Sequence, residues 1–460
     1  MTTGERIKRA GDAVVKRQLS ANEKFMASMD RGDDFGVFGV RAIVMGGWRM
    51  HGPLDVTAVQ QALDDVVARH EVLRTATVRD DGEPYACVYP PCPAKLTVVE
   101  LSPEGDEADR EHRAHVFLNE IDDRSSVDPA RMPLLHATLA RFDDEDAVLA
   151  LVTHHTVSDG WSIHLVMRDF ALYYAKRRGL PAPELPELRQ YGEYASWQER
   201  AQETESAAIA RQYWKEKLAG GYFLTIPTDR PRRHVPPVYA VYRFVYDKEL
   251  VSATTSLAKS LRSSPFMVLF ACFALFLHRR TGANDIVSAI FTSGRNEPEF
   301  EQTVGPLFNM LPVRIDLSGC ETFAELVHRA RATLLEAYSF ELPFSELAEQ
   351  AEPELMEPID TMSGVVTGFE TFQYPQELEA QVIGDVHYTG LTRRLISSDD
   401  TSEIPDGKLW DFALDPSGDM VGAVRFNSLE FDFSTVVAMI DEHRELLRAS
   451  LKSPNSALLR

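Results

Sequence analysis

The residues with the clearest chemical potential lie at positions 153–162, where two adjacent histidines are followed by an acid and a glycine in the order THHTVSDGWS. A neutral imidazole accepts a proton near neutral pH, and an amine or hydroxyl group must lose a proton when it attacks a thioester. Adjacent side chains that leave a strand point to opposite sides. One histidine can therefore face a cleft while the other packs inward. We predict that His155 is the base and that His154 has the inward, supporting role.

The acid and the glycine of the same stretch fit a turn that holds the histidines in place. Asp159 can accept hydrogen bonds from backbone amides or pair with an arginine, and Gly160 allows a backbone geometry that other residues avoid. A histidine pair alone is more often structural, and metal binding is its other use. Adjacent histidines on a strand rarely bind one ion, however, and the chain has neither HExxH nor CxxC spacing. We expect Asp159 and Gly160 to belong to a catalytic motif without a metal.

This stretch is predicted to lie between a buried strand and a helix. Residues 148–153 are an almost continuous apolar run, as in a strand that is buried on both faces, and residues 134–139 form a second strand. After Gly160, apolar residues recur at helical spacing through Phe170. The motif therefore occupies a strand-to-helix turn.

The whole chain has a globular composition, with 44% apolar and 26% charged residues among 460. Its formal net charge of −22 argues against nucleic acid and anionic membranes as partners. The start of the chain has no apolar signal region, and the longest apolar run, at 265–277, is too short to span a bilayer and is predicted to be a buried helix. Four cysteines without paired spacing indicate reduced thiols in a cytoplasmic protein.

Helix-like and strand-like periods alternate along the chain, which indicates a mixed α/β class. Residues 179–190 contain three prolines and are predicted to be a connector between domains. The second half repeats the element content of the first, which suggests two lobes with a cleft between them. Residues 374–408 have weak periodicity and many charges, and we expect them to be a long excursion from the core.

Several motifs together resemble the condensation domains of nonribosomal peptide synthetases. HHTVSDG matches their HHxxxDG motif, which is shared with chloramphenicol acetyltransferase-like acyltransferases, and the resemblance runs from about residue 17 to residue 452. The other matches are LSA at 19–21, although Asn22 replaces the usual glutamine, RHEVLRT at 69–75 for RHExLRT, YGEYASW at 191–197 for YxDFAxW, SGRN at 293–296 for the GR motif, and VGPLFNMLPVR at 304–314 for IGxFVNTxPxR.

The resemblance implies a mixed α/β fold that is a pseudo-dimer of two chloramphenicol acetyltransferase-like lobes in a V shape, with a central tunnel that contains HHxxxDG. Residues 1–180 would form the N-terminal lobe, 181–220 a connector and helix, and 221–460 the C-terminal lobe, with a latch crossover at about 374–410. Donor and acceptor would enter the tunnel from opposite faces, each able to arrive on a phosphopantetheine arm.

The resemblance also implies roles for individual residues. The second histidine of the motif is the catalytic one, which is His155 here, and the acid of the motif pairs with an arginine. Arg295 is the first candidate for that partner and Arg74 the second. The further residues that we expect to support the site or to bind substrate are Trp161, Ser158 and Asn309.

The function implied is that of a free-standing condensation enzyme in natural-product biosynthesis. It would take an acyl or aminoacyl group from a carrier-protein thioester and form an amide or an ester with a small-molecule or carrier-bound acceptor, without a bound cofactor. The HQDVPFE segment of the family appears as SFELPFS at 339–345, which leaves substrate type and carrier docking open. The basic run at 229–234 is a candidate docking patch for an acidic carrier.

Two other functions stay open. A catalytically silent module that recruits carrier or tailoring proteins would share the fold, although such modules usually lose residues of HHxxxDG. An acyltransferase of the wax-ester type would use acyl-coenzyme A, although RHEVLRT argues against it. Epimerization domains place a glutamate before the GR motif, where this chain has Phe-Thr-Ser at 291–293, and cyclization domains replace the histidines with aspartates.

Overall fold

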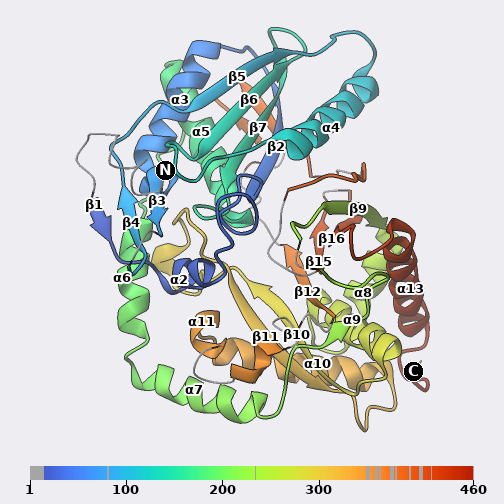
Figure 1. Cartoon of the computed structure of the whole chain (residues 1–460). Coiled ribbons are helices and arrows are strands. Elements are labelled where there is room, and N and C mark those ends of the chain that lie inside the picture. The colour runs from blue at the N-terminus through green and yellow to red at the C-terminus, as the bar shows by residue number, and fades with distance from the viewer. Residues whose placement is uncertain are drawn as a thin grey trace. The chain divides into compact units, whose positions relative to one another are not determined.

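The computed structural model divides the chain into two compact units, each made of several chain segments (Figure 1). Unit 1 comprises Met1–Ala201, Ser293–Phe308 and Tyr374–Ile396, and unit 2 comprises Gln202–Thr292, Asn309–Gln373 and Ser397–Arg460. Residues 293–308 and 374–396 therefore group with unit 1. The predicted lobes, 1–180 and 221–460, are continuous ranges and place both segments in the C-terminal lobe. The structure describes residues 15–79, 82–233, 235–348, 353–357, 361, 364–372, 378, 381–392, 395–402, 408–415 and 417–458.

A six-stranded sheet forms the centre of unit 1. Its neighbours are antiparallel except for β5 and β6, which run parallel. In spatial order the strands are β13 (Gln381–Ile383), β14 (Val386–Gly390), β2 (Ile43–His51), β7 (Asp146–His154), β6 (Leu135–Arg141) and β5 (Lys95–Glu100). All nine residues of β7 are buried, because the strand has neighbours on both edges and packed side chains on both faces. The strands predicted at 134–139 and 148–153 are confirmed as β6 and β7.

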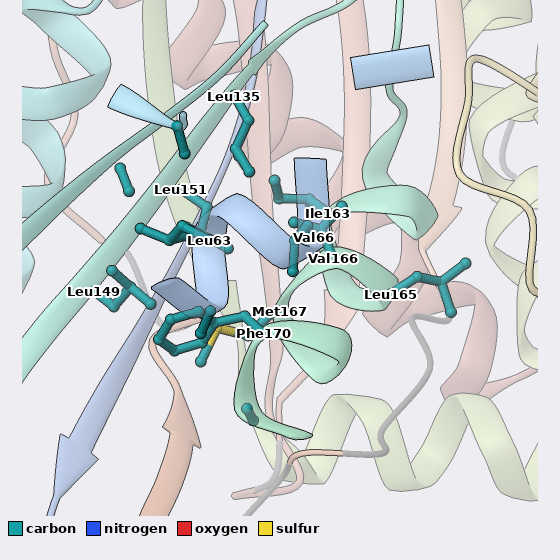
Figure 2. Close-up of a cluster of buried hydrophobic side chains, with 14 of the residues drawn as sticks. Leu63, Val66, Leu135, Leu149, Leu151, Ile163, Leu165, Val166, Met167 and Phe170 are labelled. Carbon is teal, nitrogen blue, oxygen red and sulfur yellow. The ribbon is translucent and has the colours of Figure 1, made fainter. Parts of the chain in front are cut away.

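Helices cover both faces of this sheet. The helices α3 (Val56–Arg69) and α5 (Gly160–Arg177) pack on one face, and α4 (Glu107–Arg124) packs on the other with Phe142 and Val148 (Figure 1). Figure 2 shows the larger core, in which side chains of α3, β7 and α5 lie together. The helix predicted after Gly160 is confirmed as α5, and this core holds it against the strand that carries the two histidines.

The remaining elements of unit 1 surround this core. A small antiparallel sheet has the order β1-β4-β3. The elements are β1 (Val15–Arg17), α2 (Ala21–Ser28), the 3-10 helix η1 (Glu71–Arg74), β3 (Thr75–Val78), β4 (Tyr85–Val88), α6 (Tyr191–Ala201) and the 3-10 helix η2 (Pro298–Phe300).

The segment expected to be an irregular excursion contains a strand pair. The strands β13 and β14 form a hairpin, and β14 pairs with β2 in the register Gly390↔Trp48 and His387↔His51. Residues 381–390 therefore have regular secondary structure that their weak periodicity did not predict. The periodic signal is faint because β13 is short and its first two residues are exposed. The role of a latch stays a prediction, and residues 373–377, 379–380, 393–394 and 403–407 lie outside the described part of the chain.

Unit 2 is built on a second, mixed sheet. Its order is β11-β10-β12-β15-β16-β9, and β8 pairs with β12 off this path. The β10–β12 and β12–β15 pairs are parallel, and the other pairs are antiparallel. The strands are β8 (Thr225–Ile226), β9 (Tyr239–Tyr246), β10 (Asp285–Thr292), β11 (Asn309–Asp316), β12 (Val365–Phe372), β15 (Lys408–Leu414) and β16 (Met420–Asn427).

The helices of unit 2 include the long apolar run. Residues 265–277 lie in α9, which is buried from Met267 to Leu277, so the predicted core helix is confirmed. No single helix in the described ranges is long and apolar enough to cross a membrane. The helices α8 and α9 reach that length and composition only when they are taken together, and they are bent relative to each other. The helices are α7 (Glu205–Leu218), α8 (Lys248–Ser260), α9 (Pro265–Thr281), α10 (Phe323–Ser339), α11 (Phe344–Glu346), α13 (Phe433–Lys452) and the 3-10 helix η4 (Pro353–Met356).

Candidate active site

His154, the last residue of β7, is enclosed by unit 1. Its side chain has no exposed surface, and Nδ1 accepts the backbone N–H of Thr156 at 3.2 Å. Nε2 therefore carries the proton and donates to the carbonyl oxygen of Gly39, 3.0 Å away. Burial lowers the pKa of His154 to about 3, which keeps this imidazole neutral. The inward placement predicted for His154 is present.

His155 has a different environment from its neighbour. Its backbone N–H donates to the carbonyl oxygen of Ala42 at 2.7 Å, which fixes it beside the start of β2. The side chain is only partly buried, with Nδ1 on its buried edge. Its ring meets that of Phe308 edge to face, with centroids 5.2 Å apart and planes at 64°. The strand alternation thus separates the two imidazoles as expected, and the catalytic role of His155 stays a prediction.

Asp159 closes the turn between β7 and α5. It is the N-cap of α5, and its Oδ1 accepts the backbone N–H of Ser162 at 2.8 Å. Its Oδ2 accepts the backbone N–H groups of Leu307 at 3.0 Å and Phe308 at 3.2 Å. The carboxylate is almost fully buried. It therefore fixes a helix terminus and a distant loop of unit 1 at one point.

Arg295 supplies the positive charge for this buried carboxylate. Its Nη1 donates to Asp159 Oδ2 at 2.9 Å and its Nη2 to Asp159 Oδ1 at 3.1 Å, so the pair has two contacts. The arginine side chain is 1% exposed and also donates to Ser162 Oγ at 2.9 Å. The partner that the resemblance implied is present. Gly294 precedes it with φ +63°, and a Cβ there would lie 1.7 Å from the Leu307 carbonyl oxygen, so only glycine fits.

The segment that contains Phe308 is held by two further motifs. Asn22 Nδ2 donates to the carbonyl oxygens of Pro306 at 2.5 Å and Phe308 at 3.0 Å. The Tyr191 hydroxyl donates to Pro306 O at 3.3 Å and shares a hydrogen bond of 2.8 Å with Ser20 Oγ. Sequence reasoning identified these motifs without their function. The replacement of the usual glutamine by Asn22 did not by itself predict this contact.

Arg74 is not a partner of Asp159, so the second candidate for that role is wrong. Its Nε donates to the carbonyl oxygen of Val67 at 3.3 Å, and its Nη1 donates to that of Tyr89. These contacts place Arg74 at the C-terminal end of α3, where helix carbonyls need donors. It stabilises the helix end rather than the turn at residues 154–160 between β7 and α5, called the histidine turn below.

The RHEVLRT motif ties α3 to α5 through a buried charge cluster. Asp169 of α5 has no exposed side-chain surface, and its Oδ2 accepts from Arg69 Nε at 2.7 Å and from His70 Nε2 at 2.9 Å. Burial alone would raise the pKa of Asp169, but the hydrogen bond from His70 and the neighbouring charge of Arg168 hold it at about 2. This cluster positions α5, and sequence reasoning missed it because its members are about 100 residues apart.

Three further predicted residues lie in the same turn. Trp161 contacts the guanidinium of Arg295, with Cζ 5.6 Å from the ring centroid, which fits its supporting role. Gly160 is the first residue of α5 and has helical geometry, so the expectation of an unusual backbone at Gly160 is wrong. Ser158 is fully buried, and its hydroxyl donates to the Asp159 carbonyl oxygen at 3.4 Å. A substrate contact of Ser158 and a catalytic role of Gly160 stay predictions.

Asn309 is the first residue of β11 in unit 2, and its amide groups are already used there. Nδ2 donates to Glu341 Oε1 at 3.0 Å and to the carbonyl oxygen of Leu342 at 2.8 Å, and Oδ1 accepts from the backbone N–H of Phe344 at 3.0 Å. The structure thus gives Asn309 a structural role in holding this loop. Substrate binding by Asn309 stays a prediction.

Two arginines of the basic run at 229–234 are paired within unit 2, and His234 lies outside the described residues. Arg230 Nη2 contacts the carboxylate of Asp432, and Arg232 Nε donates to Glu430 Oε1 at 3.0 Å. These pairs weaken the hypothesis of a carrier-docking patch at this run. In the described ranges, no group of three or more histidine, cysteine, aspartate or glutamate side chains is placed to hold a metal ion.

Comparison with known proteins defines the class. A family model for the condensation domain matches residues 46–459, so the chain belongs to the condensation domain family. One component of the linear gramicidin synthase from Brevibacillus parabrevis is 32% identical over 415 residues, which cover 89% of this chain and 5% of that protein. The chain therefore spans a small fraction of that curated relative.

Two solved structures show the same fold. The SgcC5 protein from Streptomyces globisporus superposes with a TM-score of 0.91 at 38% identity, covering 96% of this chain and 100% of that one. The first condensation domain of the calcium-dependent antibiotic synthetase has a TM-score of 0.76 at 20% identity, covering 96% and 98% of the two chains. The mixed α/β fold of condensation domains, predicted from the sequence, is confirmed.

Proposed function

We propose that this condensation domain transfers an acyl group from the phosphopantetheine thioester of a carrier protein to a hydroxyl group of a small-molecule acceptor, which forms an ester. Acyl transfer is supported by the family and by the histidine turn. The choice of a hydroxyl group is supported by SgcC5, whose structure contains (R)-(-)-1-(2-naphthyl)-1,2-ethanediol. The nucleophilic groups of that ligand are hydroxyls. Amide formation with an amine is the alternative product.

The observation that carries the proposal is the difference in burial and hydrogen bonding between the two histidines. His154 uses both ring nitrogens inside the core and stays neutral. His155 is partly exposed and is fixed through its backbone at the end of the same strand. Asp159 and Arg295 fix the turn that follows. This difference supports His155, and not His154, as the imidazole that meets the substrate.

The chemistry uses Nε2 of His155, because Nδ1 lies on the buried edge of the ring. The neutral imidazole takes the hydroxyl proton as the oxygen attacks the thioester carbonyl. A carbon–oxygen bond forms, the carbon–sulfur bond breaks, and the pantetheine thiolate leaves. The imidazolium then returns the proton to this thiolate. The step needs no bound cofactor, and the phosphopantetheine arm serves as substrate carrier.

Single-turnover transfer tests this role. A panel of acyl-loaded and aminoacyl-loaded carrier proteins is mixed with the enzyme and 1-phenyl-1,2-ethanediol, and ester formation is followed by mass spectrometry. We expect His155→Ala to lower the rate about 100- to 10,000-fold, the range for loss of a general base. His136→Gln, at a partly buried histidine of β6, is the matched control and should keep the wild-type rate.

The same assay separates the alternatives. Unchanged transfer by His155→Ala would remove the proposed base. Transfer from free acyl-coenzyme A without a carrier would favour the wax-ester type of enzyme. Carrier binding without any transfer would favour a recruitment module, and a product formed only with amine acceptors would replace the ester by an amide.

A further inference from the structure

Phe308 and Asn22 are two departures from the family pattern that contact each other. The pattern IGxFVNTxPxR has valine at the position of Phe308, and the opening motif has glutamine at the position of Asn22. In the structure, Asn22 Nδ2 donates to the Phe308 carbonyl oxygen at 3.0 Å. Both residues belong to unit 1. The two departures therefore form one local feature beside the histidine turn.

The backbone of Phe308 is held on both sides by side chains. Its N–H donates to Asp159 Oδ2 at 3.2 Å, and its carbonyl oxygen accepts from Asn22. Asp159 is itself fixed by its ion pair with Arg295. Because both polar groups of the Phe308 peptide have partners, the position from which the phenyl ring projects is well determined.

The ring of Phe308 lies directly against the proposed base. Its centroid is 5.2 Å from that of the His155 imidazole, and the planes meet at 64°. The side chain of Phe308 is only partly buried, so part of it is exposed. Aromatic rings attract other rings in edge-to-face and offset arrangements at about 4.5–7 Å between centroids. A valine side chain would offer less surface and no ring quadrupole.

We propose that Phe308 determines acceptor specificity: its ring beside His155 forms a subsite for an aryl group on the acceptor, and Asn22 positions that ring. The proposal rests on the function proposed above, since the acceptor must approach His155. It adds a class of acceptor, an alcohol with an aromatic group adjacent to its hydroxyl groups. It also assigns a role to Asn22, which the family pattern does not contain.

Binding measurements on the full chain test the subsite without any donor. Isothermal titration calorimetry gives the Kd of (R)-1-(2-naphthyl)-1,2-ethanediol and of 1,2-hexanediol. We expect the wild type to prefer the naphthyl diol, and Phe308→Val to reduce this preference by about 10-fold or more, as for changes in an apolar specificity pocket. Phe142→Val is the matched control, because Phe142 is buried in the separate cluster with α4.

Two variants test the positioning role of Asn22. Asn22→Asp keeps the size of the side chain but removes the donor to Phe308, and Asn22→Gln keeps an amide donor. We expect Asn22→Asp to lose the preference for the naphthyl diol, measured as the ratio of the two Kd values, and Asn22→Gln to retain it. A preference that survives in Asn22→Asp would remove the positioning role.

The outcomes for the subsite and for the proposed function are distinct. An unchanged preference in Phe308→Val would overturn the subsite, as would a wild type that does not prefer the naphthyl diol. Acyl transfer to other alcohols would leave the function standing in both cases. Conversely, Phe308-dependent binding of the naphthyl diol without transfer from any loaded carrier would support the subsite and count against the function.

Discussion

At the residue scale, one buried carboxylate makes most of the contacts that hold the site together. Asp159 accepts hydrogen bonds from Ser162, Leu307, Phe308 and both terminal nitrogens of Arg295. These contacts join the start of α5 to the loop that ends at Phe308, and the histidines precede this junction directly. Changes at Asp159 should therefore affect folding as well as rate.

We expect Asp159→Asn to lower both stability and transfer rate, because the amide leaves Arg295 buried without a charged partner. Breaking a buried ion pair typically costs about 3–5 kcal/mol of unfolding free energy. Urea denaturation measures this loss. Asp65→Asn is the control, because the Asp65–Arg177 pair is partly exposed and such pairs contribute about 0–1 kcal/mol. Full stability of Asp159→Asn with a lost rate would instead indicate a direct chemical role.

At the element scale, α5 is the part that sets the geometry of the histidine turn. Its N-terminus is held by Asp159, its middle by the Asp169 cluster, and its apolar face by the core with α3 and β7 (Figure 2). The sheet under this helix is in turn extended by the β13–β14 hairpin, which pairs with β2. At the hairpin turn, Gly384 lies close to Ala175 of α5.

We expect Gly384→Ala to weaken the hairpin. Gly384 has φ +66°, and a Cβ there would lie 3.1 Å from Leu180 Cδ1 and 3.2 Å from Ala175 Cβ. The left-handed backbone alone costs a non-glycine residue about 1–2 kcal/mol. Hydrogen exchange of residues 381–390 should accelerate. Gly418→Ala is the control, because its φ is +90°, its nearest contact would be 3.8 Å, and it lies in unit 2. Unchanged exchange in Gly384→Ala would contradict the prediction.

At the scale of the whole molecule, each unit contains a neutral histidine in its core. In unit 1 this is His154, and in unit 2 it is His443, whose Nδ1 lies 2.7 Å from the hydroxyl oxygen of Tyr246. Burial lowers the pKa of each to about 3. In the unfolded chain these two histidines bind a proton near the ordinary pKa of histidine. In the folded units they stay neutral at that pH.

We expect both units to lose stability as the pH falls from about 6.5 to about 3, because the unfolded chain binds protons there that the folded core excludes. Each such histidine contributes about 1.4 kcal/mol per pH unit within this window. Urea denaturation at pH 7 and pH 5 measures the slope. His154→Asn and His443→Asn should each flatten it, whereas His112→Gln, at an exposed position, should not. Equal slopes in all four proteins would refute this origin.

The sequence by itself determined the local chemistry of this protein. The buried strand, the turn with HHTVSDG and the helix after it follow from periodicity over a few residues, because burial imposes that pattern locally. The apolar run at 265–277 predicted the core helix α9 for the same reason. The family motifs led to the correct arginine, Arg295, as the partner of Asp159.

Only the tertiary structure decided which distant residues meet. The pairing of β14 with β2, the cluster around Asp169 and the contact of Asn22 with Phe308 join positions about 100 to 340 residues apart in the chain. Arg74 was the second candidate for the partner of Asp159, and only its contacts with the end of α3 excluded it. A hydrogen bond or ion pair between distant residues leaves no periodic pattern in either segment, because periodicity records burial and not the identity of the partner.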